Sequence, residues 1–309
     1  MENPKKISLR NKIALKLFDA YRHNAAKEHK LTYLFWECTL RCTLNCLHCG
    51  SDCRQVSSVK DMPIDDFINA VKQIIPIVDP HKTMIVFTGG EALVRKDIEQ
   101  AGIQLYLLGF PWGIVSNGYL LTKERLTSLL NAGMRACTIS LDGLKESHNW
   151  LRQNEQSFDR ALNAIKMLPT TDLRHDVVTC VNNRNFDELP QIKQLLIDCG
   201  IKEWRIFTIF PVGRAANNPD LQLSDERFKA VFDFIVETRK EGKIDQWQAG
   251  RQIVEPPGEE QTDHQTAGTD DESNATVEVG QHRHDFVDLF VVVFLQRLVE
   301  EVDDAGANA

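Results

Sequence analysis

The sequence lacks any apolar run long enough to cross a bilayer. The longest run, Phe286–Leu295, contains Asp288, whereas a membrane-spanning helix needs about 20 apolar residues. Residues 1–30 also lack the apolar core of a secretory signal. From these absences we expect a cytoplasmic protein with no membrane span.

The sequence also lacks a basic stripe of the kind that binds nucleic acid. The formal net charge is −8, but residues 246–309 carry 14 acidic and 3 basic residues, whereas the chain before them carries 30 acidic and 33 basic residues. Residues 1–245 therefore carry nearly equal numbers of acidic and basic residues. This balance predicts no nucleic-acid partner, because proteins that bind nucleic acids concentrate Lys and Arg on one face.

Cysteine is scarce outside one short segment. Five of the 8 cysteines lie between Cys38 and Cys53, and the other three, Cys137, Cys180 and Cys199, are isolated. Disulfide frameworks are typical of small secreted chains. In a reducing cytosol, clustered thiolates more often hold a metal, so the segment is a candidate metal site.

From residue 31 to 245, strand-like and helix-like segments alternate, which indicates parallel strands joined by crossover helices. Six repeats are too few for an eight-stranded barrel, so we expect an α/β fold: a partial (β/α)6 TIM-like barrel forming a core domain at 31–245. The expected strands are Tyr33–Thr39, Met84–Thr88, Gly113–Ser116, Ala136–Leu141, Asp176–Val181 and Glu203–Phe210. The expected helices lie near 63–78, 97–108, 123–132, 147–167, 187–198 and 224–241.

The two ends of the chain differ from this core. Residues 1–30 predict a helical extension with an amphipathic helix at 9–29, which we expect to pack on the core; nearby Lys5 and Lys6 leave a membrane-surface helix as an alternative. Residues 246–309 predict an irregular or disordered, acidic tail. Within it, the apolar stretch Phe286–Val299 is compatible with either a helix or a strand.

Three consecutive cysteines have a spacing that no other three consecutive cysteines in the sequence share. Cys42, Cys46 and Cys49 form C-x3-C-x2-C directly after the first expected strand. A [4Fe–4S] cluster normally takes four thiolates, so a cluster on three of them has one iron open to a ligand. A zinc site that adds Cys38 is the alternative, because structural zinc takes four ligands. The roles of Cys38 and Cys53 stay open.

This motif, after the first strand of a (β/α)6 chain, resembles the radical S-adenosylmethionine (SAM) superfamily. The resemblance implies an enzyme with a [4Fe–4S] cluster on Cys42, Cys46 and Cys49. It also implies that the open iron binds SAM and that an electron from a flavodoxin- or ferredoxin-type donor cleaves SAM to a 5′-deoxyadenosyl radical. His48 stands where the family usually has an aromatic ring.

The resemblance extends to the ends of the later strands and implies a set of SAM-binding residues. The motif Gly89-Gly90-Glu91, which follows the second expected strand, resembles the family's Gly-Gly-Glu, but Ala92 stands here in place of the usual proline. An ordinary turn is the alternative reading of Asp142, and a solvent-exposed helical position is the alternative for Arg152. The implied SAM-binding residues are Gly89, Gly90, Glu91, Asn117, Ser140, Asp142, Arg152 and Asn182.

The sixth expected strand leads into Pro211-x-Gly213-Arg214-Ala215, which resembles the same position in SPASM- or twitch-type peptide-modifying members of the superfamily. Other short sequence segments resemble a lipoprotein-associated subgroup of the superfamily. A peptide or protein substrate is therefore expected, with no catalytic residue assigned. Relatives of this type continue into a cysteine-rich domain, but no cysteine follows Cys199, so we expect that domain to have been lost or replaced. The alternatives are a tetrapyrrole- or cofactor-maturing enzyme, a non-catalytic metal-binding module and an inactive truncated protein.

Overall fold

The computed structural model describes residues 9–28 and 30–248, and these fall into two compact units. One unit contains the helix α1 (Leu9–Glu28), which confirms the predicted extent of this helix. Among the described helices, none combines the length and the apolarity that a bilayer span requires. The predictions for 249–309 lie outside the described residues.

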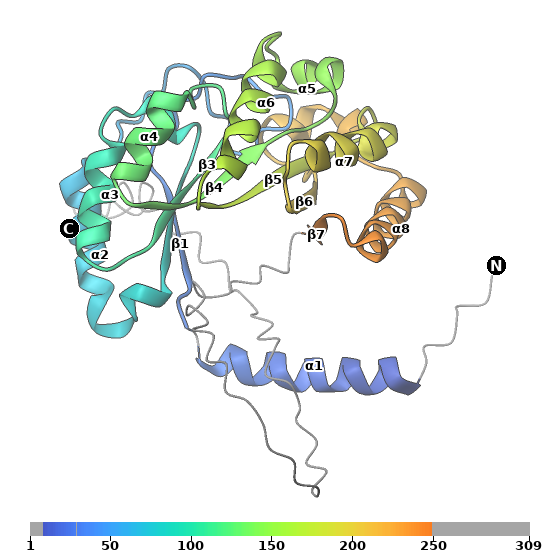
Figure 1. Cartoon of the computed structure of the whole chain (residues 1–309), viewed down its shortest axis with the longest axis horizontal. Helices are drawn as coiled ribbons and strands as arrows, with labels where there is room; N and C mark the ends of the chain where they lie inside the picture. The colour runs from blue at the N-terminus through green and yellow to red at the C-terminus, as the bar shows by residue number, and fades with distance from the viewer. Residues whose placement is uncertain (1–8, 29, 249–309) are drawn as a thin grey trace, which may run out of the picture. The chain divides into compact units, whose positions relative to one another are not determined.

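The second unit is built on a sheet of seven parallel strands that follow one another in chain order (Figure 1). This arrangement confirms the α/β class and the parallel pairing, because each strand returns to the same edge through a crossover. The strands are β1 (Tyr33–Glu37), β2 (Met84–Thr88), β3 (Trp112–Ser116), β4 (Met134–Ser140), β5 (Arg174–Val181), β6 (Glu203–Thr208) and β7 (Asp245–Gln248).

Two predictions about elements are wrong. The single helix expected at 147–167 is two helices, because Gln153 adopts a left-handed conformation with φ 55° that ends the first of them. The strand β7 was not expected, since its four residues are mostly polar and show no alternation. It forms by parallel main-chain pairing with β6. The helices of this unit are α2 (Ile64–Ile74), α3 (Ile98–Leu107), α4 (Lys123–Asn131), α5 (Lys145–Arg152), α6 (Ser157–Met167), α7 (Leu189–Asp198) and α8 (Asp225–Glu241).

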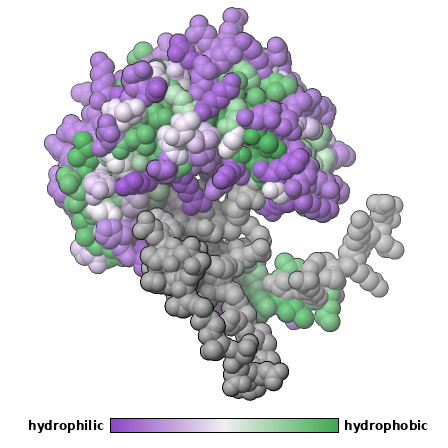
Figure 2. Space-filling model, viewed as in Figure 1, coloured by the Kyte–Doolittle hydropathy of each residue, from purple (hydrophilic) through white to green (hydrophobic). Residues whose placement is uncertain are grey.

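The core lies between these helices and one face of the sheet. Buried and half-buried residues alternate along β1, and its buried Trp36 stacks on Phe67 of α2 with ring centroids 3.7 Å apart. The visible surface of this unit is mostly hydrophilic, with apolar side chains in small groups (Figure 2). Because the strands are parallel and sequential, their carboxyl ends meet at one edge, where function gathers in barrels of this kind.

Arg95, which follows β2, is a buried cation that connects several segments of the core. Its guanidinium donates to the carbonyls of Cys38 (2.8 Å) and Met62 (2.9 Å), pairs with Asp97 at 2.7 Å, and lies 5.2 Å from the Trp36 ring centroid. Arg95 therefore ties the start of the segment after β1 to the end of β2.

We expect Arg95→Met to lower the free energy of unfolding by about 2–4 kcal/mol, because two carbonyls lose their donor and Asp97 loses its cation. Urea unfolding measures this loss. Arg135→Met is the matched control, since Arg135 is exposed and lies over Tyr106, and it should cost less than about 1 kcal/mol. Equal losses in the two variants would contradict the role given to Arg95.

Candidate metal centre

The segment after β1 that carries the cysteine motif, residues 40–54, is termed here the cysteine loop. Cys42, Cys46 and Cys53 are buried and Cys49 is half-buried, and their side chains pack in one cluster with Leu44. Cys38 instead belongs to the main core, where its thiol donates to the carbonyl of Thr88 at 3.3 Å. All 8 cysteines are free thiols. The structure thus gathers the three motif cysteines together with Cys53 and leaves out Cys38, which disfavours the zinc site that includes Cys38.

The Gly-Gly pair at the end of β2 packs directly on the backbone of this loop. The N–H of Gly90 donates to the carbonyl of Thr39 at 2.8 Å, and that of Glu91 donates to the carbonyl of Arg41 at 2.9 Å. A Cβ on Gly90 would lie 2.2 Å from the Arg41 carbonyl oxygen, and Gly89 has a φ of 117°. Both positions therefore require glycine, one for close approach and one for a left-handed backbone.

The carboxylate of Glu91 connects the ends of β2 and β3. It is buried and accepts hydrogen bonds from the Ser116 hydroxyl (2.9 Å), the Asn117 N–H (2.8 Å) and the Leu93 N–H (3.2 Å). Burial raises the pKa of Glu91, and these hydrogen bonds oppose the rise. The structure places Glu91 at the expected edge, where its carboxylate holds the turn that carries Asn117.

Two nitrogen donors approach the motif thiols. The Asn117 amide lies 3.7 Å from Cys42 Sγ, and the Arg152 guanidinium lies 3.7 Å from Cys46 Sγ. Arg152 is 8% exposed, so the alternative reading of Arg152, a solvent-exposed helical arginine, is wrong. These donors favour the thiolate forms, which are the forms that bind metal.

The thiols themselves differ in pKa. Burial raises the pKa of Cys42 to about 11 and also raises that of Cys46, against the opposing charge of Arg152. A hydrogen bond with Cys53 lowers the pKa of Cys49 to about 5 and raises that of Cys53. Metal binding displaces the remaining protons from such thiols.

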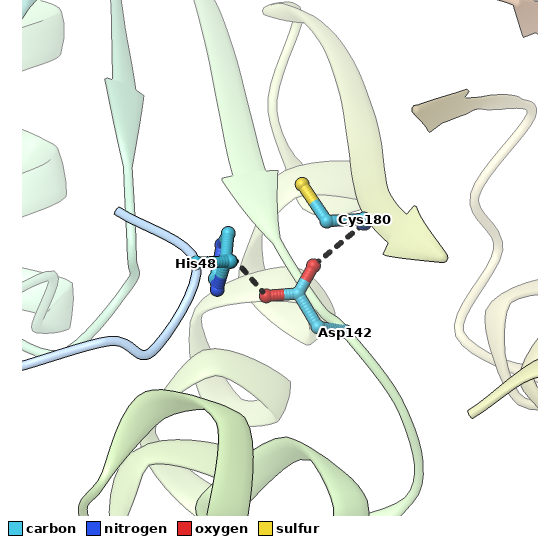
Figure 3. A group of neighbouring side chains, drawn as sticks. All are labelled: His48, Asp142 and Cys180. Atoms are coloured by element: carbon cyan, nitrogen blue, oxygen red, sulfur yellow. Dashed lines mark hydrogen bonds and ion pairs between the residues drawn. The ribbon is translucent and has the colours of Figure 1, made fainter. Parts of the chain in front are cut away.

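Arg152 is held by Asp142, the fully buried carboxylate that follows β4. One Asp142 oxygen lies 2.6 Å from Arg152 Nε. The same oxygen lies 3.8 Å from His48 Nε2, and the other accepts from the Cys180 N–H at 2.8 Å (Figure 3). Burial raises the pKa of Asp142, but Arg152, His48 and His148 outweigh it, and the net shift is downward.

His48, Asp142 and Cys180 have ligand atoms within 4.8 Å of one another, which is close enough for a metal ion. However, both Asp142 oxygens already accept hydrogen bonds from the chain, and Arg152 lies 2.5 Å away. A guanidinium at this distance repels a second cation. We therefore interpret the group as a support for the cysteine loop through Asp142 and Arg152.

The last two expected residues lie at the same edge. Ser140 is the half-buried end of β4, and Asn182 is buried in the turn after β5, where its side-chain oxygen accepts from the Arg184 N–H at 2.9 Å. Asn185 was missed by the sequence analysis. Its amide donates to the carbonyls of Asp142 (2.8 Å) and Cys180 (2.9 Å) and so joins the ends of β4 and β5.

A comparison with known families identifies the superfamily of this chain. The family model described as Radical SAM superfamily matches residues 36–196. The chain belongs to the radical SAM superfamily. It is therefore a radical SAM enzyme, and its cofactors are a [4Fe–4S] cluster and SAM, as the resemblance implied. The three gathered thiols, with an amide and a guanidinium beside two of them, fit such a cluster.

Several curated proteins are similar in sequence. An AdoMet-dependent heme synthase of Methanosarcina barkeri is 27% identical over 210 residues, covering 68% of this chain and 59% of that protein. One of Oleidesulfovibrio alaskensis is 26% identical and covers 66% and 52%. A PqqA peptide cyclase of Bradyrhizobium diazoefficiens is 26% identical over 185 residues, covering 59% and 47%. The chain thus spans about half to three-fifths of the length of these relatives.

Solved structures share the fold. Streptococcus suis SuiB bound to S-adenosylmethionine superposes with a TM-score of 0.57 and 15% identity, covering 80% of this chain and 58% of that one. Native anSMEcpe with bound AdoMet gives a TM-score of 0.58 and 19% identity, with coverage of 70% and 64%. These likenesses confirm the predicted partial barrel.

His148 makes the stability of this region depend on pH. The ring is 1% exposed, and its Nδ1 accepts from the Asp142 N–H at 2.9 Å. Burial, followed by the charge of Arg152, lowers the pKa of His148 to about 3. An unfolded histidine takes up a proton near pH 6.5. The contribution of the neutral, buried His148 ring to the free energy of unfolding is therefore complete above about pH 6.5, and it falls as the pH drops toward 3.

We expect His148→Asn, which keeps an acceptor for the Asp142 N–H, to remove this dependence. Between pH 6 and 4, the free energy of unfolding of the wild type should fall more steeply than that of the variant, by about 1.4 kcal/mol per pH unit. Anaerobic urea unfolding at several pH values measures both slopes. Identical slopes would show that His148 takes up no proton on unfolding.

Proposed function

We propose that Cys42, Cys46 and Cys49 hold the cluster and that the enzyme modifies a peptide or protein. The observation that carries the proposal is the gathering of these three thiols in one loop at the carboxyl edge of the sheet, with Asn117 and Arg152 directed at two of them. When bound, the cluster and SAM supply a 5′-deoxyadenosyl radical. Residues 31–245 form the catalytic unit in this proposal.

The residues around the thiols suit the amino-acid end of SAM, which carries both an ammonium and a carboxylate. Glu91 supplies negative charge, and Arg152 supplies positive charge near it. Gly89 and Gly90 let the end of β2 pack directly on the backbone of the loop. We infer that Asn117, Ser140 and Asn182 complete the SAM site from the ends of β3, β4 and β5, and that Asp142 acts by holding Arg152.

The peptide substrate is supported by similar proteins that are named for peptides. The relatives include a PqqA peptide cyclase, and the structures with this fold include SuiB bound to its precursor peptide SuiA, with a TM-score of 0.57 and 15% identity. Native anSMEcpe with a bound peptide gives a TM-score of 0.59 and 17% identity. A flavodoxin- or ferredoxin-type protein as electron donor and a cytoplasmic location belong to the same proposal.

A second candidate function is the modification of an iron porphyrin. It is favoured by relatives named for haem formation, which include the AdoMet-dependent heme synthases and an Fe-coproporphyrin III synthase of Methanosarcina barkeri that is 26% identical over 212 residues. This candidate keeps the same cluster and SAM site and differs only in the molecule from which hydrogen is taken.

The ligand assignment predicts which cysteines the cluster needs. After anaerobic reconstitution, Cys42→Ala, Cys46→Ala and Cys49→Ala should each reduce bound iron and sulfide, and 5′-deoxyadenosine formed with dithionite and SAM, to background. Cys38→Ala is the matched control and should retain both, because the Cys38 thiol lies in the main core. Cys53→Ala should also retain both. A wild-type protein that carries a cluster and forms no deoxyadenosine would refute the proposed SAM cleavage.

The two substrate candidates predict different stimulation. Deoxyadenosine formation should increase with a peptide encoded beside the gene, and mass spectrometry should detect a changed mass of that peptide. Fe-coproporphyrin III should leave the rate unchanged. Stimulation by the porphyrin, together with a changed porphyrin spectrum, would replace the peptide proposal with the second candidate.

A further inference from the structure

The cysteine loop is contacted by a segment far away in sequence, residues 211–218 after β6, termed here the post-β6 segment. Arg214 makes most of the contacts. Its N–H donates to the carbonyl of Cys49 at 2.9 Å, its Nε donates to that of Cys46 at 2.7 Å, and a terminal nitrogen donates to that of Cys53 at 2.9 Å. The same nitrogen pairs with Asp52 at 2.8 Å. One residue thus binds the carbonyls of three loop cysteines.

The neighbours of Arg214 are shaped for this contact. Gly213 has a φ of 57°, and a Cβ there would lie 2.2 Å from the carbonyl oxygen of Gly50 and 2.5 Å from that of Cys49. Asn218 donates to the carbonyls of Arg214 (2.8 Å) and Leu47 (3.4 Å). The post-β6 segment therefore lies directly on the loop, at a distance that a side chain at position 213 would prevent.

The cysteine loop needs such contacts because it contains no helix and no strand. Its carbonyls must find donors outside regular structure. A guanidinium is planar and presents its donors in a rigid fork, so it sets the relative orientation of the carbonyls it binds. The guanidinium binds the carbonyls of Cys46 and Cys53, whereas the backbone N–H of Arg214 binds that of Cys49. The orientation of the Cys46 peptide group in turn sets the direction of its Cα–Cβ bond, and so the position of its thiol.

We propose that Arg214 is a positioning residue that holds the cysteine loop in its ligand-presenting conformation before the cluster is loaded. The proposal rests on Cys46 and Cys49 being ligands but does not depend on the substrate. It gives the Gly213-Arg214 pair a role within the chain itself. Removal of the fork should loosen the loop and weaken cluster retention without disturbing the core.

The test compares Arg214→Gln and Arg214→Lys with Arg227→Gln. Arg227 is the matched control because it also binds a backbone carbonyl, that of Asn183 (2.6 Å), and an aspartate, Asp187 (3.2 Å), but away from the loop. The first readout is the alkylation rate of each cysteine in the anaerobic apoprotein, followed by mass spectrometry. The second is iron retained by the reconstituted protein in the presence of a chelator.

In Arg214→Gln, alkylation of Cys46 should accelerate about tenfold through local opening, while that of Cys137 in the core stays unchanged. Iron retention should fall about 10- to 100-fold, as is usual when groups supporting metal ligands are removed. Arg214→Lys should be intermediate, because it keeps the charge and loses the fork. Asp52→Asn, which removes one contact, should resemble the wild type.

Two results would overturn the proposal. One is behaviour of Arg214→Gln that matches Arg227→Gln in both readouts. The other is equal acceleration at Cys46 and Cys137, which would indicate a general loss of stability. Failure of the wild type to take up a cluster would count against the proposed ligands instead, and the apoprotein alkylation rates would still decide the role of Arg214.

Discussion

The site depends on one constraint, which is that the irregular cysteine loop must find partners for its backbone among other segments. The end of β2 donates through Gly90 and Glu91, the carbonyl of Leu151 in α5 accepts from Leu47, and Arg214 binds from the post-β6 segment. These partners are distant in sequence and meet only because parallel, sequential strands bring their carboxyl ends to one edge. The geometry of the thiols is therefore a property of the whole sheet from β1 to β6.

Buried charge is the second constraint on the site. Asp142 and Arg152 are both buried and form a close pair, which offsets the desolvation of each group. The pair keeps a cation beside the Cys46 thiol, and Glu91 keeps an anion at the neighbouring strand end. Opposite charges held apart in this way suit a zwitterionic ligand. Glu91 and Asp142 also bind chain groups, since Glu91 accepts from the Asn117 N–H and Asp142 accepts from Arg152.

Much of this arrangement could be predicted from sequence because its signals are local. The strand β2 has the expected bounds, and the cysteines whose spacing suggested a site, Cys42, Cys46 and Cys49, pack in one cluster. The helix break at Gln153 and the polar strand β7 were missed, since one depends on a single left-handed residue and the other on pairing with β6. The contacts of Arg214 could not be predicted, because its partner Cys46 lies 168 residues away.

The most direct test of the account is electron paramagnetic resonance of the reduced, reconstituted protein with and without SAM. A cluster on three thiols has one iron available to SAM, so SAM should change the g-values of the signal, and ATP at the same concentration should leave them unaltered. A [4Fe–4S] signal that is identical with and without SAM would contradict a three-thiol site that binds SAM.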